Sequence, residues 1–529
     1  MKPLRKIVAL LLSAVLLLPL TSCTQSEQTV PTIALIPLDS RPCNTQYPQL
    51  LAETSATPLL LPPETAMDSF LERADTDALW QWLEEASAQA DHLVIFTNSL
   101  FCGGLIASRS SGAYDNISES LSRLEALCRD FQKDDDHTIT VVQVLPRLKP
   151  NQYDTALFPY VDALTAYGEN WDAADAAGSA APERAAGVPQ DVLSEYRALH
   201  EKSAALAKSL NDMAGEGLID QLYISQDDGD TWCPANITFR ALAAGASENT
   251  QCIHGADELA MLLVSNLATG DMAKTPVRIE YSDTSDKDRR YPYESISLAE
   301  MTAQKLALAG LSSEDDASAT LYLHTDTADA EKTIATIHDH DGWFGLADVA
   351  QTNQADTALK DTLLAPESFE LVNAYAGWNT AGNSIGTVCA ELRAQATLAN
   401  RWENLSSEKR TQAVRALLCF RAVRLGEDVC YMTSLRESLP DAIYAAGLAD
   451  DNAAFLTDDA HQRADAMLGD AFAPYASQLA DLFNGAHQLT LPGQNADVTV
   501  SDFSTSATFP WARSFEIEIT PEMTVTIDN

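Results

Sequence analysis

The segment TIALIPLDSRPCN, residues 32–44, contains the pattern on which the rest of the chain is built. A short aliphatic run is followed at once by a polar cluster, and similar runs recur between stretches with helical periodicity, for instance at 76–90 and 256–268. Strands that alternate with helices are typical of α/β proteins, so we predict an α/β fold with largely parallel sheets and flanking helices. The pattern is compatible with an open sheet and with a closed barrel. The strands are predicted at residues 32–38, 92–97, 138–145, 220–225, 250–255, 277–282, 319–324 and 345–350.

Changes in composition divide the chain into consecutive segments. Residues 167–192 are rich in Ala, Gly and Pro, which is typical of a loop or an insertion rather than of a strand. Helical patterns dominate after about residue 388, and strand patterns return at the C-terminal end. We predict a signal peptide at 1–22, a lipidated cysteine with a tether at 23–32, an α/β domain at 33–270 with the insertion near 167–192, a second α/β segment at 271–390, a helical section at 391–487 and a short β tail at 488–529.

The N-terminal residues have the pattern of an export signal. Lys2, Arg5 and Lys6 precede an apolar run at 7–20, and the sequence LTSC then ends at Cys23. This ending resembles the lipobox of bacterial lipoproteins, which implies cleavage before Cys23 and lipidation of its thiol. An ordinary secretory signal with an incidental cysteine is the alternative. We therefore expect a protein on the extracytoplasmic face of the cell membrane, attached through a lipid anchor only.

Charge and cysteine spacing exclude several classes of protein. The formal net charge of −42 argues against a nucleic-acid partner, because affinity for phosphate backbones comes from clustered Lys and Arg. The cysteines after Cys23 form no CxxC pair and lie mostly in apolar runs, which favours buried free thiols over a zinc site. The sequence HDHD at 338–341 is predicted to be a solvated loop. We predict no metal site and no cofactor.

Polar clusters follow the predicted strands. In parallel α/β folds the loops at the carboxyl ends of the strands line one face, where ligands bind, so we expect these clusters to form one pocket. The clusters are DSRPCN at 39–44, NSLFCGGLIASR at 98–109, PRLKP at 146–150, QDDGD at 226–230, GADE at 255–258 and QTNQAD at 351–356.

Four carboxylic residues in these clusters are candidate catalytic residues: Asp227, Asp228, Asp257 and Glu258. Two carboxyl groups in unlike environments can act as general acid and base, as in glycoside hydrolysis. The alternatives are an Asp-rich turn at 227–230 and, at 257–258, acids that stabilise a helix N-terminus.

Three charged side chains in the same loops are candidate ligand-binding residues: Asp39, Arg41 and Arg109. Asp39 and Arg41 directly follow a strand, and the alternative for them is a local ion pair. Arg109 follows Gly103 and Gly104, which either let the backbone approach a ligand or simply form a tight turn.

The uncharged segment NAYAGWNTAGNSIGT at 373–387 supplies further candidate binding residues. Trp378 and Tyr375 offer flat apolar surfaces, and Asn379 and Asn383 offer amides, a combination that suits a neutral polyhydroxylated ligand. The alternative is a helix start capped by Asn379 or Thr380, with Trp378 in the core. We predict a capped helix whose Trp–Asn side faces the pocket.

Several common catalytic motifs do not occur in the sequence, including G-x-S-x-G, H-E-x-x-H, the P-loop and G-x-G-x-x-G after a strand. The remaining reading is a carboxylate-dependent hydrolase of envelope or environmental glycans. The alternative is a lipoprotein that binds a small molecule or a carbohydrate without changing it.

Seven of the motifs, taken in order, resemble bacterial proteins of domain-of-unknown-function family 4127. The motifs are PLDSRPCN, NSLFCGGLIASR, ISQDDGD, GADELAMLL, LADVAQTNQAD, AYAGWNTAGNSIGT and PWARSFEI. The resemblance covers about residues 33–519 and implies one extended functional site, without naming a reaction. The family usually has an aspartate after the second strand, where this chain has Asn98, and an Asn cannot act as a base.

Overall fold

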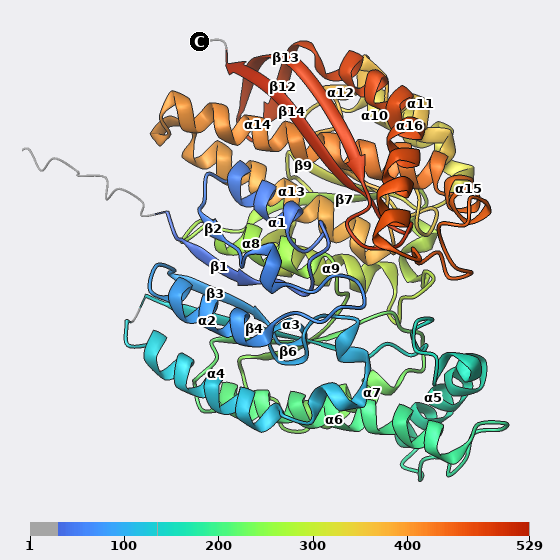
Figure 1. Cartoon of the computed structure of the whole chain (residues 1–529). Coiled ribbons are helices and arrows are strands. Elements are labelled where there is room, and N and C mark those ends of the chain that lie inside the picture. The colour runs from blue at the N-terminus through green and yellow to red at the C-terminus, as the bar shows by residue number, and fades with distance from the viewer. Residues whose placement is uncertain (1–29, 135, 528–529) are drawn as a thin grey trace, which may run out of the picture.

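The computed structural model describes residues 30–134 and 136–527, and it confirms the α/β fold. Two open parallel sheets and one antiparallel sheet make up its strands, so the question of sheet or barrel is resolved in favour of open sheets (Figure 1). The first sheet has the order β2-β1-β3-β4-β5-β6, with every pair parallel. Its strands are β1 Ile33–Ile36, β2 Leu59–Leu60, β3 His92–Phe96, β4 Thr138–Leu145, β5 Gln221–Gln226 and β6 Thr250–His254.

Helices cover both faces of the first sheet, which explains why its inner strands are buried aliphatic runs without polar alternation. α2, α4 and α6 lie on one face, and α1 and α8 lie on the other, toward the second sheet (Figure 1). The helices of this half are α1 Gln46–Thr54, α2 Thr76–Ser87, α3 Thr97–Cys102, α4 Ile117–Phe131, α5 Val161–Ala176, α6 Gln190–Gly215, α7 Pro234–Ala243 and α8 Leu259–Leu267.

The segment predicted as an insertion, 167–192, is partly helical. α5 includes its first ten residues and α6 begins at Gln190, which leaves residues 177–189 as a loop between the two helices. Buried Tyr167, on α5, packs edge-on against Tyr196 of α6. The insertion therefore builds a helical pair with its own small apolar cluster.

The second sheet has the order β11-β10-β9-β7-β8 and is also parallel. The three strands predicted at 277–282, 319–324 and 345–350 are present as β7, β9 and β10. The short strands β8 and β11 of this sheet, and β2 of the first sheet, were not predicted. Its elements are β7 Thr275–Tyr281, α9 Leu298–Leu308, β8 Leu311–Ser313, β9 Ala319–His324, α10 Ala330–Asp339, β10 Trp343–Asp348, α11 Lys360–Leu363, α12 Pro366–Phe369 and β11 Ala374–Ala376.

A long buried helix, α13 (Ala381–Arg401), lies between the two sheets. It contacts α1 and α8 of the first half and β10 and β11 of the second. Its start is fixed by a capping box, in which Thr380 and Asn383 satisfy each other's free backbone N–H groups. Gly345 of β10 makes close packing possible, because a Cβ there would lie 2.7 Å from Val388 on α13.

The C-terminal part is helical and then antiparallel, as predicted. A π-helix at Leu425–Leu435 follows α14 directly, and both are buried against the rest of the chain. The three-stranded sheet packs on α14 and α16 (Figure 1). The elements are α14 Ser407–Arg424, α15 Leu439–Ala445, α16 Asp458–Phe483, β12 Gly485–Leu491, β13 Gln494–Thr508 and β14 Glu518–Ile527.

The predicted signal peptide, Cys23 and all but the last residues of the tether lie outside the described residues. Within 30–134 and 136–527, no helix has the length and apolar character needed to cross a membrane. The eight cysteines of these ranges are free, and all except the half-buried Cys252 are buried, which confirms the prediction of buried thiols.

Candidate functional site

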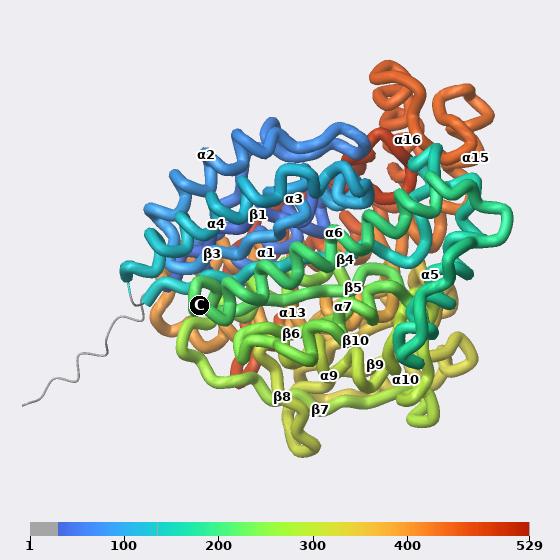
Figure 2. The backbone as a smooth tube through the Cα atoms, turned by 90° about the horizontal axis from the view of Figure 1, so that it is seen from below, coloured from blue at the N-terminus to red at the C-terminus, as the bar shows by residue number. Residues whose placement is uncertain are grey.

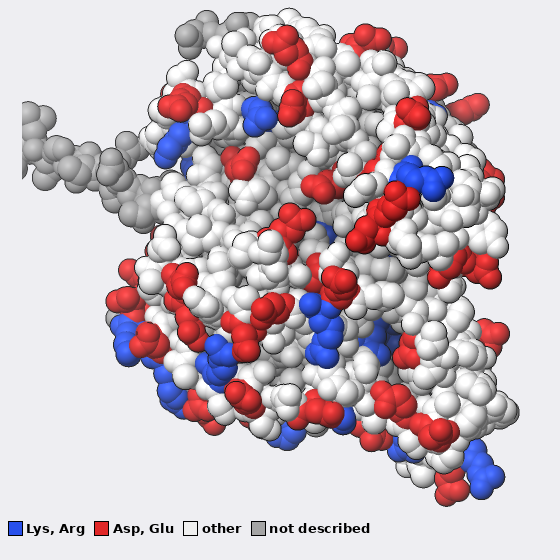
Figure 3. Space-filling model, in the orientation of Figure 1, with Lys and Arg blue, Asp and Glu red and all other residues white. Residues whose placement is uncertain are grey.

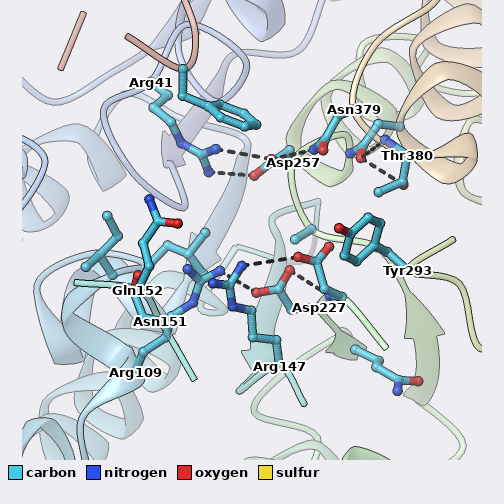
Figure 4. Close-up of a pocket in the computed structure, with 18 of the residues that line it drawn as sticks. Arg41, Arg109, Arg147, Asn151, Gln152, Asp227, Asp257, Tyr293, Asn379 and Thr380 are labelled. Atoms are coloured by element: carbon cyan, nitrogen blue, oxygen red, sulfur yellow. Dashed lines mark hydrogen bonds and ion pairs between the residues drawn. The ribbon is translucent and has the colours of Figure 1, made fainter. Parts of the chain in front are cut away.

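A polar cavity of about 180 Å³ lies where the carboxyl ends of the two sheets meet (Figure 4). Four arginines and four carboxylic residues line it, in a chain with 34 basic and 76 acidic residues. The lining charges are thus balanced where the protein as a whole is strongly negative. The eight residues are Arg41, Arg109, Arg147, Arg513, Asp227, Asp228, Asp257 and Glu294.

Arg41 joins the loop after β1 to the loop after β6. Its guanidinium donates to Asp257 at 2.6 Å and 3.2 Å and to Asp39 at 2.6 Å and 3.0 Å. Asp39 is fully buried behind Arg41 and does not line the cavity, so it orients the arginine. Burial raises the pKa of Asp257 to about 6, although the charge of Arg41 opposes this shift.

Two more ion pairs cross the cavity wall side by side (Figure 4). Arg109 Nη2 lies 2.6 Å from Asp227 Oδ2, and Arg147 Nη1 lies 3.3 Å from Asp228 Oδ2. Arg109 comes from the loop after α3, and Arg147 follows β4 directly. The two aspartates follow β5, so three neighbouring strands supply the four side chains.

The neighbouring carboxyl groups of Asp227 and Asp228 have opposite pKa shifts. Burial raises the pKa of Asp228 to about 7, and the negative charge of Asp227 adds to this effect. Burial acts on Asp227 as well, but the charges of Arg109 and Arg147 outweigh it and lower the pKa of that carboxyl below its ordinary value. Near neutral pH, Asp227 is therefore ionised while Asp228 holds a proton part of the time.

Asn379 faces the cavity from the second half of the chain. Its amide donates to Asp257 Oδ2 at 3.3 Å, and its backbone has a φ of +49°, in the left-handed region that Asn tolerates. Thr380 caps α13, as the capped-helix alternative predicted, and Asn383 sits at N3 and donates to Glu258 at 2.7 Å. The helix is thus capped as predicted, and of the Trp–Asn side only Asn379 and Asn383 line the cavity.

Glu258 lies beneath the cavity rather than on its surface. It is fully buried in an ion pair with Lys305, which is also fully buried. Gly255 has a φ of +104°, and a Cβ there would lie 1.8 Å from Glu258 Oε1. Glu258, predicted as a candidate catalytic residue, is thus enclosed by protein groups and does not line the cavity.

The two aromatic residues of the segment 373–387 are buried. Trp378 is 5% exposed, and its indole N–H donates to Thr387 at 3.0 Å within α13. Its ring packs edge-on against Tyr47 of α1. Tyr375 lies within β11 and is 3% exposed. Neither lines the central cavity, and Trp378 instead borders a small hollow beside it, together with Arg41, Asp257 and Asn379.

Gly103 and Gly104, for which ligand approach and a tight turn were both open, lie against protein side chains. Gly103 ends α3 in a left-handed turn, and a Cβ on Gly104 would lie 2.5 Å from Asp68. Gly386 of α13 packs on the side chain of Glu258. The tight-turn alternative therefore applies to Gly103 and Gly104.

The side-chain amide of Asn98 makes two hydrogen bonds that hold neighbouring segments together. It donates to the carbonyl oxygen of Val144 and accepts from the N–H of Val144, each at 2.8 Å. An ionised carboxylate could not donate the first of these bonds. The Asn98 side chain thus ties the end of β3 to the end of β4.

Sequence reasoning missed several residues that line the cavity. Arg147 was inside a quoted cluster, PRLKP, but was not singled out, and Arg513 belongs to the motif PWARSFEI, which served only for the family resemblance. Tyr293 lies in the loop after β7, and the polar stretch SDTSDKDRRYPYES at 282–295 was not among the predicted clusters. The loop between β13 and β14 brings Trp511 over Arg41, with the guanidinium carbon 5.2 Å from the ring centre.

Two larger hollows adjoin the cavity and share lining residues with it. One, of about 790 Å³, shares Arg147, Asp228 and Tyr293 and is bounded by α5. The other, of about 530 Å³, shares Arg513 and reaches Pro440 of α15. α5 and α15, which border these hollows, lie toward the same edge of the molecule in both ribbon views (Figures 1 and 2).

The sequence HDHD does not form a metal site in the structure. His338 and Asp339 end α10, and His340 Nε2 lies 3.0 Å from the Thr320 hydroxyl, so only part of the segment is the predicted loop. Across residues 30–134 and 136–527, no group of three or more His, Cys, Asp and Glu side chains is arranged to hold a metal ion.

The fold and the cavity define a two-sheet α/β protein with a charged site between the carboxyl ends of its sheets. The chain belongs to the family described as "Protein of unknown function (DUF4127)", whose model matches residues 33–520. This match confirms the family resemblance drawn from the seven motifs. Comparisons with curated proteins and with solved structures gave no significant match.

Proposed function

We propose that this protein is an extracytoplasmic lipoprotein that hydrolyses a glycan of the cell envelope or the environment at the central cavity. The observation that carries the proposal is the pair Asp227 and Asp228, which follow β5 and face one cavity with different partners. Asp227 is paired at 2.6 Å with Arg109, whereas Asp228 is more loosely paired and 31% of its side chain is exposed. Two carboxyl groups kept in unlike protonation states are the usual equipment for acid–base chemistry.

In this proposal Asp228 is the general acid. Its pKa of about 7 leaves a proton to donate to the glycosidic oxygen as the bond to the leaving sugar breaks. Asp227 stays ionised and stabilises positive charge that develops on the sugar ring. Asp257, with a pKa of about 6, accepts a proton from the attacking water.

The aromatic surface for the sugar is Tyr293. Its side chain is 45% exposed at the junction of the central cavity and the hollow beside α5, where Trp378 was expected to act. Asn379 supplies an amide beside Asp257, on the side away from Arg41 (Figure 4). The adjoining hollows suit a substrate longer than one sugar.

A panel of glycans and muropeptides incubated with wild type and with Asp228→Asn tests the proposal. Wild type is expected to release product from at least one substrate, and Asp228→Asn to lose that activity. The matched control is Asp316→Asn, which changes an exposed aspartate between β8 and β9, and it should keep full activity. Turnover that Asp228→Asn retains, or no turnover of any substrate, would refute the assignment.

A second candidate, non-catalytic ligand binding, is favoured by one observation. Asp257 is already bound by two donors of Arg41, and Asp227 by Arg109, so these carboxylates can simply order the loops. The same panel separates the two functions. A binding protein would bind a glycan without cleaving it, both as wild type and as Asp228→Asn.

A further inference from the structure

The four arginines of the cavity are neutralised to different degrees. Arg41 lies between two carboxylates, Asp39 and Asp257, each within 2.6 Å. Arg513 is paired through two hydrogen bonds with Glu516. Arg41 therefore has little capacity left for a ligand, and the charge of Arg513 is balanced by a carboxylate that it binds at 2.7 Å and 3.0 Å.

Arg147 and Arg109 differ from the other two. In the described part of the chain, Arg147 donates only to the Lys149 carbonyl, at 3.1 Å, and to Asp228, at 3.3 Å. Among the same residues, nothing accepts a hydrogen bond from the buried Nε of Arg109. Two adjacent guanidinium groups thus keep N–H donors that protein groups do not use (Figure 4).

The local charge also favours an anion at this place. Arg109 and Arg147 face Asp227 and Asp228, but Asp228 is partly protonated near neutral pH, so the four groups carry a net positive charge. Burial, and next the positive charge of Arg109, lowers the pKa of Arg147, although Asp228 and Asp227 oppose this shift. In Figure 3, basic side chains near the middle of the face shown lie next to acidic ones, and further basic side chains are scattered toward its edges.

We infer that Arg109 and Arg147 form a subsite for an anionic group, a carboxylate or a phosphate, on a sugar whose ring lies against Tyr293. Planar guanidinium groups bind such oxyanions through paired hydrogen bonds. The backbone of Tyr293 has a φ of +68°, which a bulky side chain seldom adopts, and its carbonyl accepts from the N–H of Gly229 at 3.0 Å. This bond ties Tyr293 to the segment that follows Asp228, and in Figure 4 the ring lies across the Asp227 carboxyl group from Arg109 and Arg147.

The inference rests on the proposed glycan substrate and narrows it to acidic sugars. The protein as a whole repels anions, so a local cluster of donors is the means by which it could accept one. A neutral sugar offers the free donors of Arg109 and Arg147 only uncharged oxygens, whereas the charged oxygens of a carboxylate or a phosphate form stronger hydrogen bonds with a guanidinium group.

Calorimetric titration with monosaccharides tests this subsite without any need for turnover, because these probes have no glycosidic bond to cleave. The probes are N-acetylmuramic acid against N-acetylglucosamine, and glucuronic acid and glucose 6-phosphate against glucose. At least one acidic probe should bind roughly tenfold more tightly than its neutral counterpart, with the preference falling in high salt. Whichever of glucuronic acid and glucose 6-phosphate binds more tightly shows whether the subsite prefers a carboxylate or a phosphate.

Arg147→Ala should abolish the preference, Arg147→Lys should keep part of it, and Arg129→Ala, on the exposed face of α4, should leave it unchanged. Melting curves of all variants separate loss of the subsite from loss of the fold. Equal binding of acidic and neutral probes, including no binding of either, would overturn the inference, as would a preference that survives Arg147→Ala. An acidic preference without turnover of any glycan would support the subsite while refuting hydrolysis.

Discussion

Arg41 and Asp257 are separated by 216 positions in the sequence, yet two hydrogen bonds of 2.6 Å and 3.2 Å join them at the cavity wall. The bond connects the loop after β1 with the loop after β6, at opposite sides of the first sheet. Asp39 behind the arginine and Asn379 beside the aspartate extend this connection to the second half of the chain. The geometry of the site therefore depends on a buried ionic network.

Removal of Arg41 should be strongly destabilising. Arg41→Ala leaves Asp39 and Asp257 as buried carboxyl groups without their cation, and loss of one partner of a buried pair costs about 3–5 kcal/mol. Urea unfolding at neutral pH measures the change. Lys208→Ala, which removes an exposed pair with Asp212, serves as the control and should change the free energy of unfolding very little. Equal effects of the two substitutions would contradict the account.

The packing around Glu258 predicts a large difference between two glycine substitutions. Gly217 has a φ of +76° and nothing near its missing Cβ, so Gly217→Ala pays only for the left-handed backbone, about 1 kcal/mol. Gly255→Ala meets Glu258 in addition and should lower the free energy of unfolding several times more. Thermal melting of the two variants checks this, and similar melting temperatures would show that the Glu258–Lys305 pair can move aside.

The strands were predictable because buried parallel strands are aliphatic runs bounded by polar residues. β2, β8 and β11 were missed since runs of two or three residues carry no periodicity, and β11 lies inside the polar segment 373–387. Placement of polar clusters at strand ends also identified Arg41, Asp228 and Asp257 before their contacts were known.

The rest of the site depends on partners that no local pattern reveals. Glu258 looked like an accessible acid, but Lys305, 47 positions later, encloses it. Trp378 looked like a ligand platform, but Thr387 and Tyr47 hold it in the core. The loop that carries Trp511 comes from the C-terminal sheet, and only the folded chain brings it to Arg41.

Truncation of Tyr293 should weaken sugar binding with little effect on stability, whereas truncation of Trp378 should lower stability. Tyr293→Ala removes an exposed ring, so the melting temperature should stay nearly constant while affinity for the best-binding sugar of the panel falls roughly five- to tenfold. Trp378→Ala removes a buried ring and should cost about 3–5 kcal/mol of stability. Calorimetric binding and urea unfolding of both variants test the pair. Unchanged affinity in Tyr293→Ala would rule out its part as a platform.

The proposed lipid anchor makes a separate prediction about Cys23. Cells that express wild type and are fed labelled palmitate should yield a labelled protein in the membrane fraction. Cys23→Ala should carry no label, and the protein should be released or remain unprocessed. Cys252→Ala is a suitable control, because it changes a half-buried thiol far from the export signal and should keep the label. Absence of label from wild type would refute the anchor.

The pH dependence of kcat/KM for a hydrolysed glycan tests the central claim most directly. A general acid must be protonated, so activity should fall as pH rises through about 7, the pKa of Asp228. The base must be ionised, so activity should also fall as pH drops below about 6, the pKa of Asp257. The account predicts a narrow bell-shaped profile in wild type and loss of activity in Asp228→Asn. A rate that stays constant through pH 7, or an Asp228→Asn variant as active as wild type, would contradict it.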